Sequence, residues 1–205
     1  MIEHSVTSLL DELLPETQML LKCASLLKGE FSLSELFAFR DLVMRDQCVD
    51  EASFTDLRSK FQCPGTAYKI LQENSILEDI VIEDTEDGDF AEADRCRFTH
   101  SLMRKVAYES LTSSQQILLQ SVYLDLLEAR PEKPSLMFLA AVAENGNVYG
   151  KAARYYMEAA SGQSRAFANK SAQVSIYKAR ENLQKELFFP LVGFFFFFFS
   201  SSPFP

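Results

Sequence analysis

The sequence lacks an excess of basic residues. Its 205 residues include 20 Lys and Arg against 29 Asp and Glu, which gives a net charge of −9 at pH 7. Nine of the carboxylates lie between Glu78 and Asp94, so the remaining acids and bases balance. Proteins that bind nucleic acid use Lys and Arg to neutralise phosphates. The charge pattern therefore argues against nucleic acid as a partner.

Metal-ligand pairs are also missing. The four cysteines are separated by 25, 15 and 33 positions, and neither histidine lies beside one; they are Cys23, Cys48, Cys63 and Cys96. Structural zinc sites usually bring Cys or His together in pairs two to four residues apart. We therefore expect no metal site and reduced, mostly buried thiols.

The sequence has neither a charged segment followed by an apolar leader nor a long apolar run. The first pattern would indicate secretion, so we expect a cytoplasmic protein. The longest candidate for a membrane anchor, Leu187 to Phe199, spans 13 residues and contains Pro190. A spanning helix needs about 20 residues, so no membrane attachment is expected.

The last segment, residues 188–205, has low complexity. Six consecutive phenylalanines, Phe194 to Phe199, are followed by Ser, Pro and Phe alone. All three residue types have codons made only of pyrimidines. We hypothesise that this segment is a translated polypyrimidine tract, artefactual or disordered; a natural tail is the alternative.

What the sequence does contain is enough apolar residues, 47%, to form a core. Apolar spacing of 3.6 residues predicts several helices in the first part of the chain. They span Ser5–Leu14, Glu16–Lys28, Ser32–Phe39, Asp50–Gln62 and Thr66–Glu73. Residues Val43 to Cys48 read as an irregular passage between them.

The stretch from Arg97 to Leu111 predicts a strand that leads directly into a helix, with Thr99 as N-cap. The β-branched run Ile80–Ile82 predicts a second strand, joined to Cys96–Phe98 by an acidic turn. Helices, a two-stranded ribbon and a further helix follow one another in winged-helix order. We predict a mainly α protein whose first domain, residues 3–128, is winged-helix-like.

A second helical region is predicted over residues 132–187. A capping box of Ser113 and Gln116 opens the helix before it, and Pro131 ends that helix. Beyond Ser135 the segments are rich in alanine, with aromatic residues between them. Small residues opposite Tyr or Phe are typical of stacked helical hairpins, so we call this region TPR-like, after the tetratricopeptide repeat.

Three features of the sequence bear on a binding or catalytic site. Gly146 to Ala152 resembles a phosphate-binding loop, but the glycine spacing is one residue short and Ala152 lacks the hydroxyl that binds magnesium. An interhelical turn with a solvated Lys151 is predicted instead. Glu83 to Asp94 resembles a calcium loop but lacks its preceding helix and final glutamate, so a solvated acidic turn is predicted. His100 is interpreted as structural. No catalytic, cofactor-binding or metal-binding residue is predicted, and no cofactor.

Three stretches carry a resemblance to a known family: Leu9 to Phe31, Arg97 to Leu111 and Lys151 to Asn182. They resemble the region that follows the nucleotide-binding module in soluble, type 10, adenylate cyclases and in related STAND-type signalling ATPases. The middle stretch, with Phe98-Thr99-His100-Ser101-Leu102-Met103-Arg104, is the most specific. Together the three stretches cover about the first 185 positions with gaps.

The resemblance implies a parent protein in which paired cyclase domains make cyclic AMP from ATP and a P-loop module precedes a winged helix and helical repeats. No cyclase aspartate or genuine P-loop is present, so this fragment is not expected to be an enzyme. It is predicted to be a regulatory or interaction segment, with the parent's nucleotide-binding and cyclase domains, and other proteins, as partners. Two alternatives remain open: a scaffold segment of a signalling ATPase without cyclase activity, and a free-standing helical interaction module.

Overall fold

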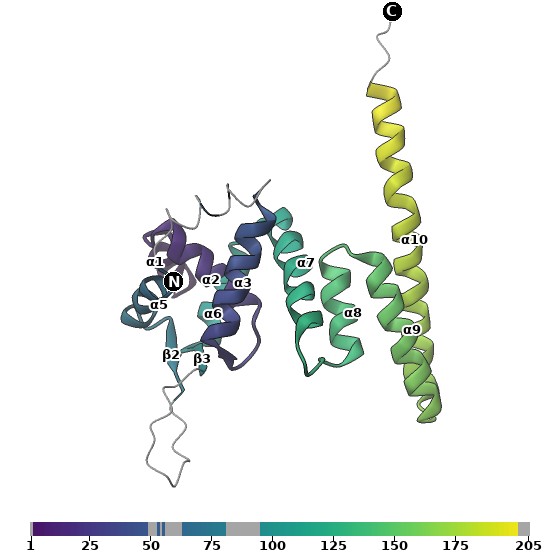
Figure 1. Cartoon of the computed structure of the whole chain (residues 1–205), viewed down its shortest axis with the longest axis horizontal. Coiled ribbons are helices and arrows are strands. Elements are labelled where there is room, and N and C mark those ends of the chain that lie inside the picture. Colours follow the sequence, from purple (N-terminus) through teal and green to yellow (C-terminus); the bar gives the residue numbers. More distant parts are fainter. Residues whose placement is uncertain (1, 49–52, 54, 56–62, 81–94, 201–205) are drawn as a thin grey trace, which may run out of the picture. The chain divides into compact units, whose positions relative to one another are not determined.

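The computed structural model describes residues 2–48, 53, 55, 63–80 and 95–200, with residues 2–6 and 189–200 described by their backbone alone. This described part is mainly helical and contains a small three-stranded antiparallel sheet (Figure 1). The chain divides into two compact units, Met1–Val122 and Tyr123–Pro205. Helix α7 (Ser113–Ala129) begins in the first unit and ends in the second.

The first unit contains most of the helices that apolar spacing predicts. They are α1 (Ile2–Asp11), α2 (Pro15–Leu26), α3 (Leu33–Asp46), α5 (Pro64–Glu73) and α6 (Ser101–Glu109). Pro15 and Pro64 each open a helix, where a missing N–H costs no hydrogen bond. Ser32 caps α3, since its Oγ accepts a hydrogen bond from the Glu35 N–H at 3.0 Å. The predicted helix Asp50–Gln62 lies almost entirely outside the described residues.

Helix α3 is longer than predicted. It continues to Asp46, so most of the passage from Val43 to Cys48 is helical and not irregular. Val43 and Met44 are buried there, which places them in the core of the first unit. Tertiary burial stabilises this last turn, although its own apolar spacing is weak.

The sheet differs from the predicted two-stranded ribbon. It has three strands, β1 (Phe31–Ser32), β2 (Leu77–Asp79) and β3 (Arg95–Phe98), in the order β1-β3-β2. In the register, Leu77 pairs with Phe98 on one side of β3, and Phe31 pairs with Cys96 on the other.

The second strand therefore begins three residues before the predicted strand Ile80–Ile82. Leu77 is 1% exposed, and its burial opposite Phe98 decides the register more strongly than the β-branched run does. Ile80 follows β2 and donates its N–H to the Arg95 carbonyl at 2.9 Å. Residues 81 and 82 lie outside the described part.

Strand β3 leads into α6 through two residues. The N-cap of α6 is His100 and not Thr99. Thr99 still belongs to the pairing beside the sheet, because its N–H donates to the Ile76 carbonyl at 3.1 Å. The helix ends at Glu109, and Val106 and Ala107 are its buried residues.

The capping box of α7 lies one residue earlier than predicted. The Gln115 N–H donates to Thr112 Oγ1 at 3.2 Å, and the Thr112 N–H donates to Gln115 Oε1 at 3.1 Å. Each of these two residues thus provides a side-chain acceptor for the backbone N–H of the other, and both N–H groups lie at the start of the helix, where no helical carbonyl is available. Threonine and glutamine serve here in place of the predicted Ser113 and Gln116.

The second unit continues with α8 (Leu136–Asn145), α9 (Tyr149–Arg165) and α10 (Asn169–Ser200). Ser135 caps α8 by accepting the Phe138 N–H at 3.3 Å. Helix α9 packs against both α8 and α10 (Figure 1). The buried positions are mostly alanines, which allow the helices to approach closely; they are Ala140, Ala143, Ala152, Ala153, Ala159, Ala160, Ala172 and Ala179.

Two turns in this unit use the left-handed region. Asn147 follows α8 with φ 58°, and Phe167 follows α9 with φ 58°. After α9 the Phe167 N–H donates to the Ser164 carbonyl and the Ala168 N–H to the Gln163 carbonyl. This pair of bonds is a Schellman motif, which normally has glycine at the left-handed position.

Backbone helix continues through the start of the low-complexity segment. Helix α10 extends to Ser200, so residues 188–200 are helical, and residues 201–205 lie outside the described part. Among the residues searched, which are the described ones, no helix is long and apolar enough to cross a membrane. The origin of the segment in a polypyrimidine tract stays a hypothesis.

Candidate interaction surfaces

The cysteines form no site in the described residues. All four are free thiols, and no group of three or more His, Cys, Asp or Glu among the described residues could hold a metal ion. Cys23 and Cys96 are buried, but Cys48 is only half-buried and Cys63 is exposed, so the expectation of mostly buried thiols holds for two of them. Burial raises the pKa of the Cys23 thiol to about 12, against an opposing effect of Arg40. This thiol is therefore protonated and unreactive at neutral pH.

His100 is exposed at the start of α6, and its side chain makes no capping hydrogen bond. Its neighbour Arg104 extends toward α2 and donates to the Ser25 carbonyl at 3.3 Å. Among the described residues, no hydrogen bond or ion pair joins the imidazole to a nucleophile or carboxylate. The structural role of His100 stays a prediction.

The segment that resembles a phosphate-binding loop forms the turn between α8 and α9. Gly146 is the C-cap of α8, and the Gly150 N–H donates to Glu186 Oε2 on α10 at 3.1 Å. A carboxylate of the same chain thus already contacts the N-terminus of α9, where an anion would bind. The calcium-like segment Glu83 to Asp94 lies outside the described residues.

Lys151 is not a solvated lysine as predicted. Its Nζ lies 3.1 Å from Asp125 Oδ1 and 2.9 Å from Glu128 Oε2, so it joins α9 to the last turns of α7. Burial lowers the pKa of Lys151, but the hydrogen bonds that its ammonium donates to the two carboxylates outweigh burial, and the net pKa is raised. Tyr155 completes the group by donating a short hydrogen bond to Glu128.

A second polar group holds α8, α9 and α10 together. The Tyr156 hydroxyl donates to Glu144 Oε2 at 2.9 Å, and Lys185 Nζ lies 3.4 Å from Glu144 Oε1. Burial raises the pKa of Glu144, but hydrogen bonds from Tyr156, Asn182 and Lys185 outweigh it, so the net pKa is lowered. Lys178 lies over the Tyr156 ring, 5.2 Å from its centre. These charges are already paired and offer no vacant ligand position.

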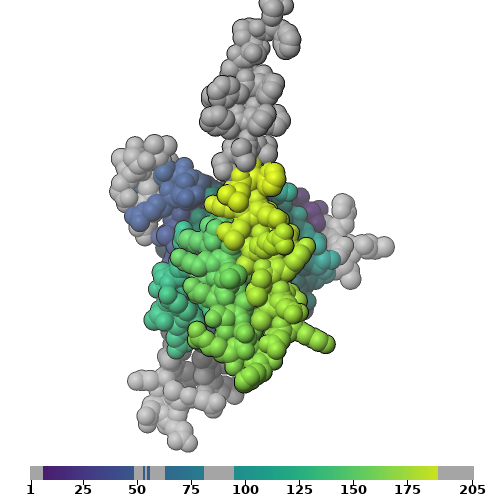
Figure 2. Space-filling view, turned by 90° about the vertical axis from the view of Figure 1, so that its right-hand side faces the viewer, coloured from purple at the N-terminus to yellow at the C-terminus, as the bar shows by residue number. Residues whose placement is uncertain are grey.

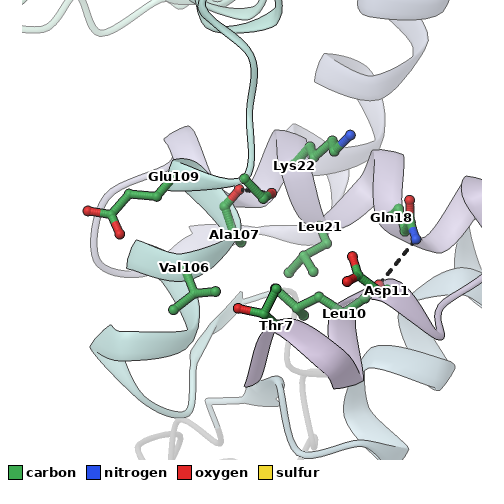
Figure 3. Close-up of a pocket in the computed structure, with 10 residues that line it drawn as sticks. Thr7, Leu10, Asp11, Gln18, Leu21, Lys22, Val106, Ala107 and Glu109 are labelled. Carbon is green, nitrogen blue, oxygen red and sulfur yellow. Dashed lines mark hydrogen bonds between the residues drawn. The ribbon is translucent and has the colours of Figure 1, made fainter. Parts of the chain in front are cut away.

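The first unit has a cavity of about 350 Å³ between α1, α2 and α6 (Figure 3). Its inner wall is apolar and includes Leu10, Leu21 and Val106. The Gln18 amide at the rim donates to the carbonyls of Leu10 and Leu13. In Figure 3 the charged groups of Lys22 and Glu109 point away from the interior. Thr7, Asp11 and Ser110 also line the cavity, so its wall combines polar with apolar side chains.

A second cavity of about 220 Å³ lies between α2, α3 and the first half of α7. Its apolar lining includes Met19, Val43 and Leu119, and three glutamine side chains form part of its edge. At about 220 Å³ this cavity is smaller than the roughly 300–1,000 Å³ of typical small-molecule sites.

Most of the exposed large apolar side chains in the described part of the second unit belong to α10, whose residues up to 188 are the light green to yellow part of Figure 2. Six large apolar side chains of this helix are exposed: Val174, Ile176, Tyr177, Leu183, Leu187 and Phe188. No binding residue is predicted here from the sequence, although large apolar residues recur at helical spacing along α10. Large apolar residues at regular helical spacing on an exposed face mark interaction surfaces.

No family model, curated protein or solved structure matches this chain.

Proposed function

We propose that the chain is a non-catalytic interaction segment that resembles part of a soluble, type 10, adenylate cyclase. The parent protein would make cyclic AMP from ATP, and this segment would contact its nucleotide-binding and cyclase domains and other proteins. The observation that carries the proposal is the direct passage from β3 into α6. It uses the residues of the most specific resembling stretch, Arg97 to Leu111.

The first unit supports a winged-helix interpretation. Helix α2, strand β1, helices α3 and α5, and strands β2 and β3 follow in winged-helix order, and the central position of β3 fits that fold. Helix α5, which would be the recognition helix, carries one basic residue, Lys69, and one acidic residue, Glu73. Arg97 on β3 is paired with Glu78 at 2.7 Å. Without a basic face, such a domain fits a protein partner better than nucleic acid.

The second unit supports a TPR-like interpretation. Helices α8 and α9 form a hairpin, and α10 packs on α9 through buried Ala172 and Ala179. Polar groups centred on Glu128 and Glu144 fix the neighbouring helices. An array of this kind serves as a binding surface and carries no catalytic group of its own.

Two measurements test the proposal. The purified chain, incubated with ATP and Mg²⁺, is expected to form no cyclic AMP, and measurable turnover would overturn the non-catalytic assignment. Sequencing the genomic DNA and transcript upstream of the Met1 codon then separates the classes. A continuous reading frame with a P-loop and cyclase domains supports the cyclase relationship.

A scaffold segment of a STAND-type signalling ATPase is the second candidate, because the resembling stretches are common to both. A P-loop without cyclase domains in the upstream frame favours that candidate. A promoter directly upstream of Met1 instead favours a free-standing interaction module and contradicts both.

A further inference from the structure

One row of side chains on α10 points away from the rest of the second unit. Ile176, Arg180, Leu183 and Leu187 are spaced i, i+4, i+7 and i+11, which places them on one face of the helix. Ile176 is 50%, Leu183 49% and Leu187 68% exposed. We name these four residues the outer row.

The other faces of α10 are already used. Ala172, Ser175, Ala179 and Asn182 are buried, and the Ser175 hydroxyl hydrogen-bonds Gln163 of α9 at 2.9 Å. Lys185 reaches Glu144 of α8. Helices α8 and α9 thus cover two adjoining sides of α10. The outer row lies on a third side of α10, which faces neither of these helices.

The row requires an occupant because of its composition. Three large aliphatic side chains beside one another have no described element over them, so a partner that covers them would remove apolar surface from water. Arg180 lies between them, and no ion pair joins it to a described residue. An arginine within an apolar row calls for a carboxylate from the partner.

A second copy of the chain fits this row poorly. Antiparallel pairing that matches Ile176 of one copy with Leu187 of the other places Arg180 opposite Leu183. The two arginines then face each other across the pair with an axial offset of about 4.5 Å, and the row offers no carboxylate to pair with either of them. The pattern favours a different helix with an acidic residue.

We propose that the outer row binds an amphipathic helix of a partner protein, which covers Ile176, Leu183 and Leu187 with aliphatic side chains and presents a Glu or Asp to Arg180. This inference rests on the proposed function, since it gives the interaction segment a specific class of partner. Three turns of partner helix are enough to cover the row. Binding by helix packing adds a layer to the helices already present.

The test uses two stapled helical peptides of about 18 residues that share one leucine and alanine face, because unconstrained peptides of this length are marginally helical. One peptide carries glutamates beside the apolar face and the other carries lysines. Fluorescence anisotropy with the full chain is expected to give about tenfold tighter binding of the acidic peptide. Equal binding of both peptides, or binding of neither, would overturn the proposal.

Charge reversal locates the site. Arg180→Glu is expected to reverse the preference between the two peptides. Lys170→Glu changes the net charge equally but lies outside the row, so it should leave the preference within about twofold. If both variants behave alike, the contact with Arg180 is absent and the proposal fails.

Apolar truncation provides a second, independent readout. Leu183→Gln is expected to weaken both peptides about tenfold, whereas Val174→Gln, on another face of α10, should not. Circular dichroism of each variant confirms that the fold persists. Every variant keeps residues 188–205, so any binding by that segment is the same in all of them.

Self-association is the alternative outcome. If sedimentation shows that the native chain is a dimer and that Leu183→Gln dissociates it, the row serves self-association and the proposal is contradicted. Cyclic AMP formation would overturn the proposed function while leaving the peptide result intact.

Discussion

The two units differ in how their helices meet, although both bury large side chains, for example Phe39 in the first unit and Tyr156 in the second. The core of the first unit contains large side chains, among them Phe39, Leu20, Leu36 and Met44, each essentially inaccessible to solvent. The second unit packs its helices through alanines and ties them with tyrosine, lysine and glutamate side chains. A core of large residues loses most when a side chain is shortened, whereas helices in close contact lose most when one is lengthened. This comparison predicts different sensitivities in the same chain.

The largest effect is expected in the first unit for Phe39→Ala. Phe39 is 0% exposed, so truncation removes a buried ring and leaves a cavity between α3 and its neighbours. The free energy of unfolding should fall by about 3–5 kcal/mol. Hydrogen exchange followed by mass spectrometry measures the loss for peptides of α2 and α3 separately from the second unit. A loss below about 1 kcal/mol would show that this core is not tightly packed.

The opposite kind of substitution tests the second unit. Ala179 is 1% exposed on the side of α10 that packs on α9, so Ala179→Leu should push the helices apart and cost about 1–3 kcal/mol. Exchange protection in peptides of α9 and α10 is the measurement. Gln173→Leu, an exposed position on the same helix, serves as the control and should change protection little. If Ala179→Leu is neutral, close packing does not distinguish the second unit from the first.

The polar group around Glu144 predicts a dependence on acid. Its pKa is lowered in the folded protein, so its stabilising effect is present above the usual value of 4.5 and is lost as the pH falls through the lowered value. Glu144→Gln should cost about 1.5 kcal/mol at pH 7. Urea unfolding at pH 7 and pH 3 is expected to show a smaller difference between variant and native chain at pH 3. A constant difference would contradict the assignment.

The smallest effect is an expected gain. Phe167 is 89% exposed and has φ 58°, a conformation that costs an L-residue about 1 kcal/mol. Phe167→Gly should therefore raise the free energy of unfolding of the second unit by about 0.5–1 kcal/mol. Gly29 has φ 72° in the first unit, and Gly29→Ala should produce a loss of about 1 kcal/mol. Unfolding midpoints in urea that move in opposite directions would support both assignments; a shared direction would contradict one of them.

Most helices could be predicted from the sequence, but the contacts that depend on the fold could not. Apolar spacing predicted the bounds of α2 and α5 to within a few residues. A helix with one buried face has apolar residues at regular intervals along its sequence. Strand β1 is only two residues long, and it forms because β3 offers it a partner 65 positions away. Two residues are too few for apolar spacing to predict a strand.

The candidate surfaces illustrate the same limit. The pairing of Lys151 with Asp125 and Glu128 depends on α9 lying beside α7, which the spacing of glycines around Lys151 cannot reveal. The outer row could have been found as a spacing of apolar residues in α10. The exposed side of α10, however, depends on where α8 and α9 pack. Only the structure shows that packing.

The exposed thiol at the start of α5 has a practical consequence. Because Cys23 and Cys96 are inaccessible and Cys48 is partly covered, a maleimide dye should react first at Cys63. A fluorophore at that position would report on docking to the first unit without any engineered attachment point.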